Sequence, residues 1–237
     1  MTRFKGILFD KDGTLFEFET LWHDIMGKLF KRLSERYGVT SEQLGALKAY
    51  SGYGEEAFEK ESPSQYLSTH ELTRAWGDIL FPGKPGIASE LMALFEEVAL
   101  EAAEQVQLLE GVSEILEFLK ARGYALGIAT ADTWGSTYKG LKQSGILDYF
   151  DYVGVDDGVT RPKPHPEHAL KFSRRVGIEL KEMLIVGDSF NDFKFAQNAG
   201  VPFVGIQARY NDFEKMEDEA LFVIHKVEEL KGVLEKL

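Results

Sequence analysis

The chain has 237 residues, of which 44% are hydrophobic and 28% are charged, and its formal net charge is −12. This composition is that of a globular protein of one or two domains, and the acidic balance argues against nucleic acid or an anionic membrane as a partner, because both attract Lys and Arg. The absence of cysteine excludes disulfides, thiolate catalysis and Cys-ligated metals, and it is compatible with a reducing compartment.

The first predicted element is a short buried strand at residues 7–9, which runs directly into the acidic sequence Asp-Lys-Asp-Gly-Thr at residues 10–14. The residues before it have no apolar region long enough for a signal peptide. No later apolar run approaches the length of a transmembrane helix. We therefore expect a cytoplasmic protein.

Residues 17–105 have the pattern of helices alone. The segment 19–37 places an apolar side chain at every fourth position from Leu21 to Leu33, which is the spacing of an amphipathic helix. Further helical patterns cover residues 41–49, 70–80 and 88–105. We therefore expect an all-helical insertion at residues 17–105, which is called the cap below, within a core domain that is formed by residues 1–16 and 106–237.

Aromatic side chains are frequent in this helical interval. We expect them to form the interior of the cap and not to stack on substrate, because aromatic residues at helical spacing usually face a core. They are Trp22, Phe30, Trp76, Phe81 and Phe95. Two arginines, at positions 32 and 36, and the loop at residues 51–56 are the cap segments that we expect to approach a substrate.

After residue 105, short apolar runs alternate with helical patterns that end at glycine. The apolar runs predict buried strands at residues 125–129, 152–155, 183–186 and 203–206. The helical patterns cover residues 112–122, 137–144, 166–176 and 190–198. This alternation predicts an α/β core with a doubly wound, Rossmann-like parallel sheet, whose strands all end at the edge that binds ligands.

Two carboxylates follow the first predicted strand. Asp10 ends the strand at the ligand-binding edge, and Asp12, two residues later, can return to the same side. Gly13 allows a sharp turn that brings backbone N–H groups towards an anion. Taken alone, this pair is as consistent with a solvated turn as with a catalytic site.

Later strand ends carry further groups that suit phosphate and a metal ion. Thr130 offers a hydroxyl group, and Lys163 can neutralise a phosphoryl group from its place before a predicted helix. Asp188 and Asp192 supply the oxygen ligands that Mg²⁺ prefers. Each residue alone also has a plain structural interpretation, such as an exposed lysine or an acid at a helix N-terminus. Together, four carboxylates and one lysine leave three negative charges, which favours a divalent cation.

The order of these motifs along the chain is specific. Asp-x-Asp-Gly-Thr, a strand-end Thr, Lys-Pro and Gly-Asp-x-x-x-Asp resemble the four signature motifs of the haloacid dehalogenase (HAD) superfamily. The segments 109–124 and 188–202 resemble its phosphoglycolate phosphatase-like branch. The resemblance implies a helical cap and a Mg²⁺-dependent phosphatase that acts on a small phosphorylated metabolite, phosphoglycolate or a similar phosphomonoester. Glu17 and Phe18 replace the Asp-Ser that this branch often has there, which argues against phosphoglycolate itself.

The same resemblance implies a role for each motif residue. Asp10 attacks phosphorus and becomes an aspartyl phosphate, while Asp12 protonates the leaving alkoxide and then activates water. Thr130 and Lys163 hold the phosphoryl oxygens. The implied metal ligands are Asp10, Asp12 through its backbone carbonyl, Asp188, and Asp192, which binds directly, through water or by positioning Lys163.

Two alternatives share this chemistry. A β-phosphoglucomutase-like phosphotransferase keeps both carboxylates, although Thr14 stands where such mutases typically have Val, which favours hydrolysis. A phospho-receiver signalling module, which is not an enzyme, also uses an aspartyl phosphate, Mg²⁺, a Thr and a Lys-Pro. The long insertion after the first motif, and the acidic motif at 187–192 after Lys163, argue against a receiver.

Overall fold

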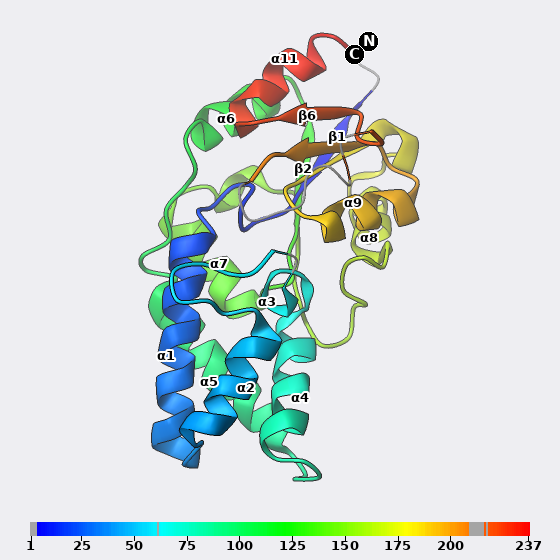
Figure 1. Ribbon diagram of the computed structural model, residues 1–237. Helices are drawn as coiled ribbons and strands as arrows, with labels where there is room; N and C mark the ends of the chain where they lie inside the picture. Colours follow the sequence, from blue (N-terminus) through cyan, green and yellow to red (C-terminus); the bar gives the residue numbers. More distant parts are fainter. Residues whose placement is uncertain (1–3, 61, 209–215, 217) are drawn as a thin grey trace.

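The computed structural model describes residues 4–60, 62–208, 216 and 218–237. In this part of the chain one parallel sheet has the strand order β3-β2-β1-β4-β5-β6 (Figure 1). Its strands are β1 (Gly6–Phe9), β2 (Ala125–Ala129), β3 (Tyr152–Gly154), β4 (Met183–Gly187), β5 (Phe203–Ile206) and β6 (Phe222–Ile224). The order is that of a Rossmann-like doubly wound sheet, so the predicted fold class is confirmed. The sequence predicted five of these strands and missed β6.

Helices cover both faces of the sheet. They are α6 (Val112–Ala121), α7 (Trp134–Gln143), α8 (Glu167–Val176), α9 (Phe190–Ala199) and α11 (Leu230–Leu234). Ile7 and Phe9 of β1 pack in one apolar cluster with α6 and α11, and Leu8 packs in another with α8 and α9. Successive residues of a strand point to opposite faces, so a strand that is apolar throughout requires both layers.

The remaining helices lie together beyond one end of the sheet (Figure 1). They are α1 (Glu19–Tyr37), α2 (Ser41–Ser51), α3 (Pro63–Tyr66), α4 (Thr69–Leu80) and α5 (Ile87–Ala102). Their apolar faces form a separate cluster in which Phe30, Trp76 and Phe95 are buried and Trp22 and Phe81 are partly buried. The part of the expectation that places these aromatic residues in the apolar interior of the helices is therefore confirmed. None of the helices in the described ranges is long and apolar enough to cross a membrane.

Two chain crossings connect the helical cluster to the sheet, and they lie side by side. Glu17 donates its backbone N–H to Gln107 O at 2.9 Å, and Leu109 donates to Leu15 O at 2.9 Å. We propose that residues 17–105 form a cap domain on a core of residues 1–16 and 106–237. The separate apolar cluster and these paired crossings support that division.

The N-terminal end of α4 also reaches the core. Thr69 donates its backbone N–H to Ala131 O at 3.1 Å, and His70 donates its own to Asp156 Oδ2 at 2.7 Å. Both acceptors lie just beyond the ends of strands in the core. The helix cluster is therefore held above the edge of the sheet where the strands end.

Candidate active site

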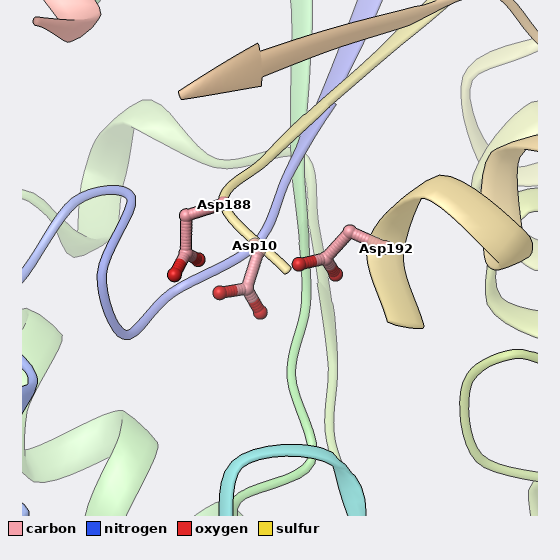
Figure 2. A group of neighbouring side chains, drawn as sticks. All are labelled: Asp10, Asp188 and Asp192. Carbon is pink, nitrogen blue, oxygen red and sulfur yellow. The ribbon is translucent and has the colours of Figure 1, made fainter. Parts of the chain in front are cut away.

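The centre of the site is the point where the strand order reverses, between β1 and β4. Phe9 of β1 is paired with Val186 of β4, so the residues that follow the two strands emerge next to each other. Asp10 and Asp188 are those residues, and Asp192 joins them from the first turn of α9 (Figure 2). Oxygen atoms of the three carboxylates all lie within 4.8 Å of one another. Ligands of doubly wound sheets bind at such a reversal point.

Lys163 lies between two of these carboxylates. Its Nζ donates to Asp10 Oδ1 and to Asp192 Oδ1, at 2.6 Å in each case. The second oxygen of Asp192 accepts hydrogen bonds from the N–H of Ser189 at 3.1 Å and from its hydroxyl at 2.5 Å. Ser189 is the N-cap of α9, so the capping interaction that starts this helix also orients Asp192. Asp192 in turn holds Lys163 beside Asp10.

Thr14 and Gly187 support the acidic group, and the sequence did not single them out for this. The buried Thr14 donates its hydroxyl to Asp188 Oδ1 at 3.2 Å. A Cβ at Gly187 would lie 2.5 Å from the Cβ of Asp192, so only glycine allows this helix turn to approach the strand so closely. Gly13 has a φ of 83°, as the predicted sharp turn requires.

Asp12 belongs to a second ion-paired group. The buried Lys11 lies 2.8 Å from Asp12 Oδ2 and 3.1 Å from Asp132 Oδ2. Asp132 also accepts one hydrogen bond from the hydroxyl of Ser136, at 2.8 Å. The sequence interpretation missed Lys11 and Asp132. One feature of the sequence could have revealed this ion pair: Lys11 stands between Asp10 and Asp12, and a lysine buried at such a position needs a carboxylate partner.

Thr130 lies at the end of β2, next to this group. Its hydroxyl oxygen accepts the backbone N–H of Asp132 at 3.1 Å. A hydroxyl that accepts through its oxygen keeps its hydrogen available, so Thr130 can donate to a bound anion. The structure thus brings together every site residue that the sequence predicted.

The charges of the site do not balance. Five carboxylates, including Asp132, face two ammonium groups, which leaves three negative charges. Burial raises the pKa of Asp10 to about 7; Lys163 opposes this rise, and Asp192 and Asp12 add to it. Burial also raises the pKa of Asp12, against the attraction of Lys11. Burial alone would lower the pKa of Lys163, but the neighbouring carboxylates outweigh it and raise that pKa. Hard oxygen ligands with excess negative charge fit a divalent cation such as Mg²⁺.

A cavity of about 520 Å³ joins this acidic group to the helical cluster. The cap contributes mainly apolar side chains to its lining, among them Phe18, Trp22, Leu72 and Phe95. Trp22 and Phe95 therefore serve both the cap interior and the cavity. Neither the two arginines nor the loop at residues 51–56, all expected near the substrate, are among the residues that line it. Arg32 and Arg36 are instead paired with Glu97 and Glu101 on α5. That expectation was wrong.

The fold and this strand-end constellation define a hydrolase with an aspartate at the end of its central strand. The family model described as haloacid dehalogenase-like hydrolase matches residues 7–206. The probable phosphatase IndB of Dickeya dadantii (strain 3937) is 30% identical over 205 residues, which are 84% of this chain and 80% of IndB. The phosphoglycolate phosphatase of Escherichia coli (strain K12) is 34% identical over 145 residues, 57% of this chain and 58% of that protein.

Solved structures are similar over nearly the whole chain. A HAD-superfamily hydrolase of subfamily IA, variant 1, from Geobacter sulfurreducens PCA has a TM-score of 0.63 and 25% identity, and the match covers 98% of this chain and 97% of that one. A structure described as a predicted phosphoglycolate phosphatase from Haemophilus somnus 129pt has a TM-score of 0.73 and 24% identity, with 98% and 99% covered, and it shares the fold.

The chain therefore belongs to the haloacid dehalogenase-like hydrolase family, in its phosphoglycolate phosphatase-like branch. The expected enzyme class, a HAD-type phosphatase, is confirmed, and the alternative of a non-enzymatic phospho-receiver module is set aside.

Proposed function

We propose that the protein is a Mg²⁺-dependent phosphatase that hydrolyses a small phosphomonoester through an aspartyl phosphate on Asp10. One observation carries the proposal. The Asp10 carboxylate ends the central strand at the floor of the cavity, with Lys163 at 2.6 Å on one side and Asp188 on the other. A carboxylate can attack a phosphoryl group only if nearby positive charge offsets their mutual repulsion; Lys163 supplies part of that charge, and a divalent cation held by Asp10 and Asp188 would supply the rest.

The reaction has two steps. An Asp10 oxygen attacks phosphorus as the bond from phosphorus to the leaving oxygen breaks, and Asp12 gives that oxygen its proton. In the second step, Asp12 removes a proton from water, the water oxygen attacks phosphorus, and inorganic phosphate leaves Asp10. Both protons pass through one carboxyl group, so Asp12 returns to its initial state after each turnover.

The other predicted residues bind and position. We propose that Thr130 and Lys163 donate hydrogen bonds to the phosphoryl oxygens. Asp10, Asp188 and the backbone carbonyl of Asp12 would hold Mg²⁺, which when bound neutralises charge on the phosphoryl group. Both oxygens of Asp192 already accept hydrogen bonds within the protein. We therefore propose that Asp192 acts through Lys163 or through a metal-bound water.

A screen for release of inorganic phosphate tests this function. Sugar phosphates, nucleotides, phosphoglycolate and aryl phosphates are each offered with Mg²⁺, with excess chelator, and with the Asp10→Asn variant as the control. We expect Mg²⁺-dependent release that Asp10→Asn abolishes. Activity that survives in chelator would contradict the metal, and activity in Asp10→Asn would contradict the nucleophile. Isomerisation of a hexose 1-phosphate without phosphate release would favour the mutase alternative.

A further inference from the structure

The cavity has two chemically different ends. The core end carries the carboxylates, Thr130 and Lys163. The cap end presents three aromatic rings in succession, with 6.3 Å between the centroids of Phe18 and Trp22 and 5.9 Å between those of Trp22 and Phe95. Phe95 is fully buried and Phe18 nearly so, so the partly buried Trp22 presents most of the aromatic surface of this wall, and the other two rings hold it in place. A phosphoryl group at the core end would direct its leaving group towards these rings.

The cap end has no positive charge. Of the residues that line the cavity in the described ranges, the lysines are Lys163 and Lys194, and both belong to the core. Lys163 is engaged by two carboxylates, and the Nζ of Lys194 lies 5.1 Å above the ring centroid of Phe190. A leaving group with its own carboxylate or phosphate would therefore enter a part of the cavity that does not neutralise it, at a site already rich in negative charge.

Three polar side chains that the cap contributes to the cavity already make hydrogen bonds within the protein. Ser64 donates its hydroxyl to Ser51 O at 2.7 Å, and Thr69 donates its own to Ala131 O at 3.3 Å. The side-chain oxygen of Gln65 accepts the N–H of Ser62 at 3.0 Å. A sugar places several hydroxyl groups in the site, and the groups already engaged in these bonds leave fewer partners to replace the water that those hydroxyl groups lose. The cap end is therefore poorly suited to a polyhydroxylated leaving group.

The indole N–H of Trp22 is a buried donor that lacks such a bond. Its nitrogen is buried and makes no hydrogen bond of normal geometry with the described residues. Trp22 and Asp12 both line the cavity. Since Asp12 is the proposed proton donor to the leaving oxygen, the ester oxygen of a substrate would lie in the part of the cavity that Asp12 and Trp22 share.

We propose that the substrate is a phosphomonoester with an uncharged aromatic leaving group, which packs on the Phe18–Trp22–Phe95 wall while the Trp22 N–H donates to the ester oxygen. This inference rests on the proposed function, whose substrate it specifies. It places phosphoglycolate and hexose phosphates among the poor substrates, since the first brings a carboxylate and the second several hydroxyl groups to the aromatic wall.

Three substrates with the same reacting group test the proposal. They are 2-phenylethyl phosphate, phosphoglycolate and glucose 6-phosphate, all esters of primary alcohols, so Asp12 must protonate the same kind of oxygen in each. Initial rates of phosphate release with Mg²⁺ give kcat/KM for each substrate. We expect the value for 2-phenylethyl phosphate to exceed each of the others by at least about ten-fold, as pocket complementarity of this kind provides.

Two substitutions at one position separate the ring from its N–H. Trp22→Phe keeps an aromatic ring and removes the donor, so kcat/KM should fall for all three substrates by a similar factor, about three- to ten-fold. Trp22→Leu removes the ring as well. Compared with Trp22→Phe, Trp22→Leu should lower kcat/KM for 2-phenylethyl phosphate a further three- to ten-fold or so. The kcat/KM for phosphoglycolate should stay nearly unchanged. Trp134→Leu, which changes an exposed tryptophan on α7, is the matched control.

The outcomes are distinguishable. If phosphoglycolate or glucose 6-phosphate is turned over as efficiently as 2-phenylethyl phosphate, the proposed substrate class is wrong and the phosphatase function stands. A preference for phosphoglycolate that Lys194→Gln removes would likewise overturn it, because Lys194 would then supply the missing cation. If none of the three esters, nor 4-nitrophenyl phosphate, releases phosphate with Mg²⁺, the proposed function itself fails.

Discussion

Replacement of the nucleophile should stabilise the protein while abolishing its activity. Burial raises the pKa of Asp10 from 3.8 to about 7, which means that the folded state disfavours the ionised carboxylate. At about 1.4 kcal/mol for each pKa unit, full ionisation costs the fold about 4 kcal/mol. Asp10→Asn removes that cost with nearly the same shape. Lys163 keeps a counter-ion in this variant, because Asp192 lies 2.6 Å from its ammonium group.

The sign of the pH dependence follows from the direction of the pKa shift. Below pH 3.8 the carboxyl group is protonated in both states and costs nothing. Between pH 3.8 and about 7 the folded state retains the proton that the unfolded state loses, so wild-type stability falls as pH rises. Above that range the full cost is present. The gain from Asp10→Asn should therefore be about 2–3 kcal/mol larger at pH 8 than at pH 5.

Urea unfolding of wild type and Asp10→Asn in chelator, at pH 5 and pH 8, measures this difference. Asp148→Asn makes the same chemical change at an exposed position and should alter the free energy of unfolding by less than about 0.5 kcal/mol. Mg²⁺ should stabilise the wild type more than Asp10→Asn, since it supplies the missing positive charge. The electrostatic argument would be refuted if Asp10→Asn were less stable than wild type at pH 8, or if it changed the free energy of unfolding by the same amount at both pH values.

Three further substitutions test the surroundings of the acidic group. Thr14→Val removes the hydroxyl that donates to Asp188, and we expect the Mg²⁺ concentration for half-maximal activity to rise about three- to ten-fold; an unchanged Mg²⁺ titration would contradict this role. Gly187→Ala places a Cβ 2.5 Å from the Cβ of Asp192, and urea unfolding should show a loss of about 1–3 kcal/mol together with lower activity. Gly45→Ala is its matched control: it adds a methyl group to open space on helix α2 and should stabilise by up to about 1 kcal/mol, with unchanged kinetics.

The sheet and its ligand-binding edge were predictable because the strands are short and apolar throughout. Buried parallel strands need no alternation, so β1, β2 and β4 stand out as apolar runs that are followed directly by Asp10, Thr130 and Asp188. Strand β6 has three residues and lies at an edge, as the predicted strand β3 does, but no Gly, Asp or Pro stands directly beside its apolar run to mark its ends. Helix α3 escaped prediction because four residues cannot show a helical period.

The proposed catalytic residues could be predicted because they follow strands whose ends meet at one edge of the sheet. The residues that pair with them could not be predicted in the same way. Lys11 and Asp132 are 121 positions apart, and their ion pair depends on how β1 and β2 are paired. The dual role of Trp22 was equally hidden. The helical period showed that its side chain faces inward, but only the position of α1 over the sheet edge exposes part of it to the cavity.

The most direct test of the aspartyl phosphate is a burst experiment with Asp12→Asn. 4-Nitrophenolate leaves without needing a proton, so 4-nitrophenyl phosphate can phosphorylate Asp10 in this variant, whereas the second step lacks the base that activates water. Stopped-flow absorbance should show rapid release of about one nitrophenolate for each protein molecule, followed by slow turnover. The same experiment with Asp10→Asn should show no burst. Wild-type steady-state turnover in Asp12→Asn, or a burst in Asp10→Asn, would contradict the proposed mechanism.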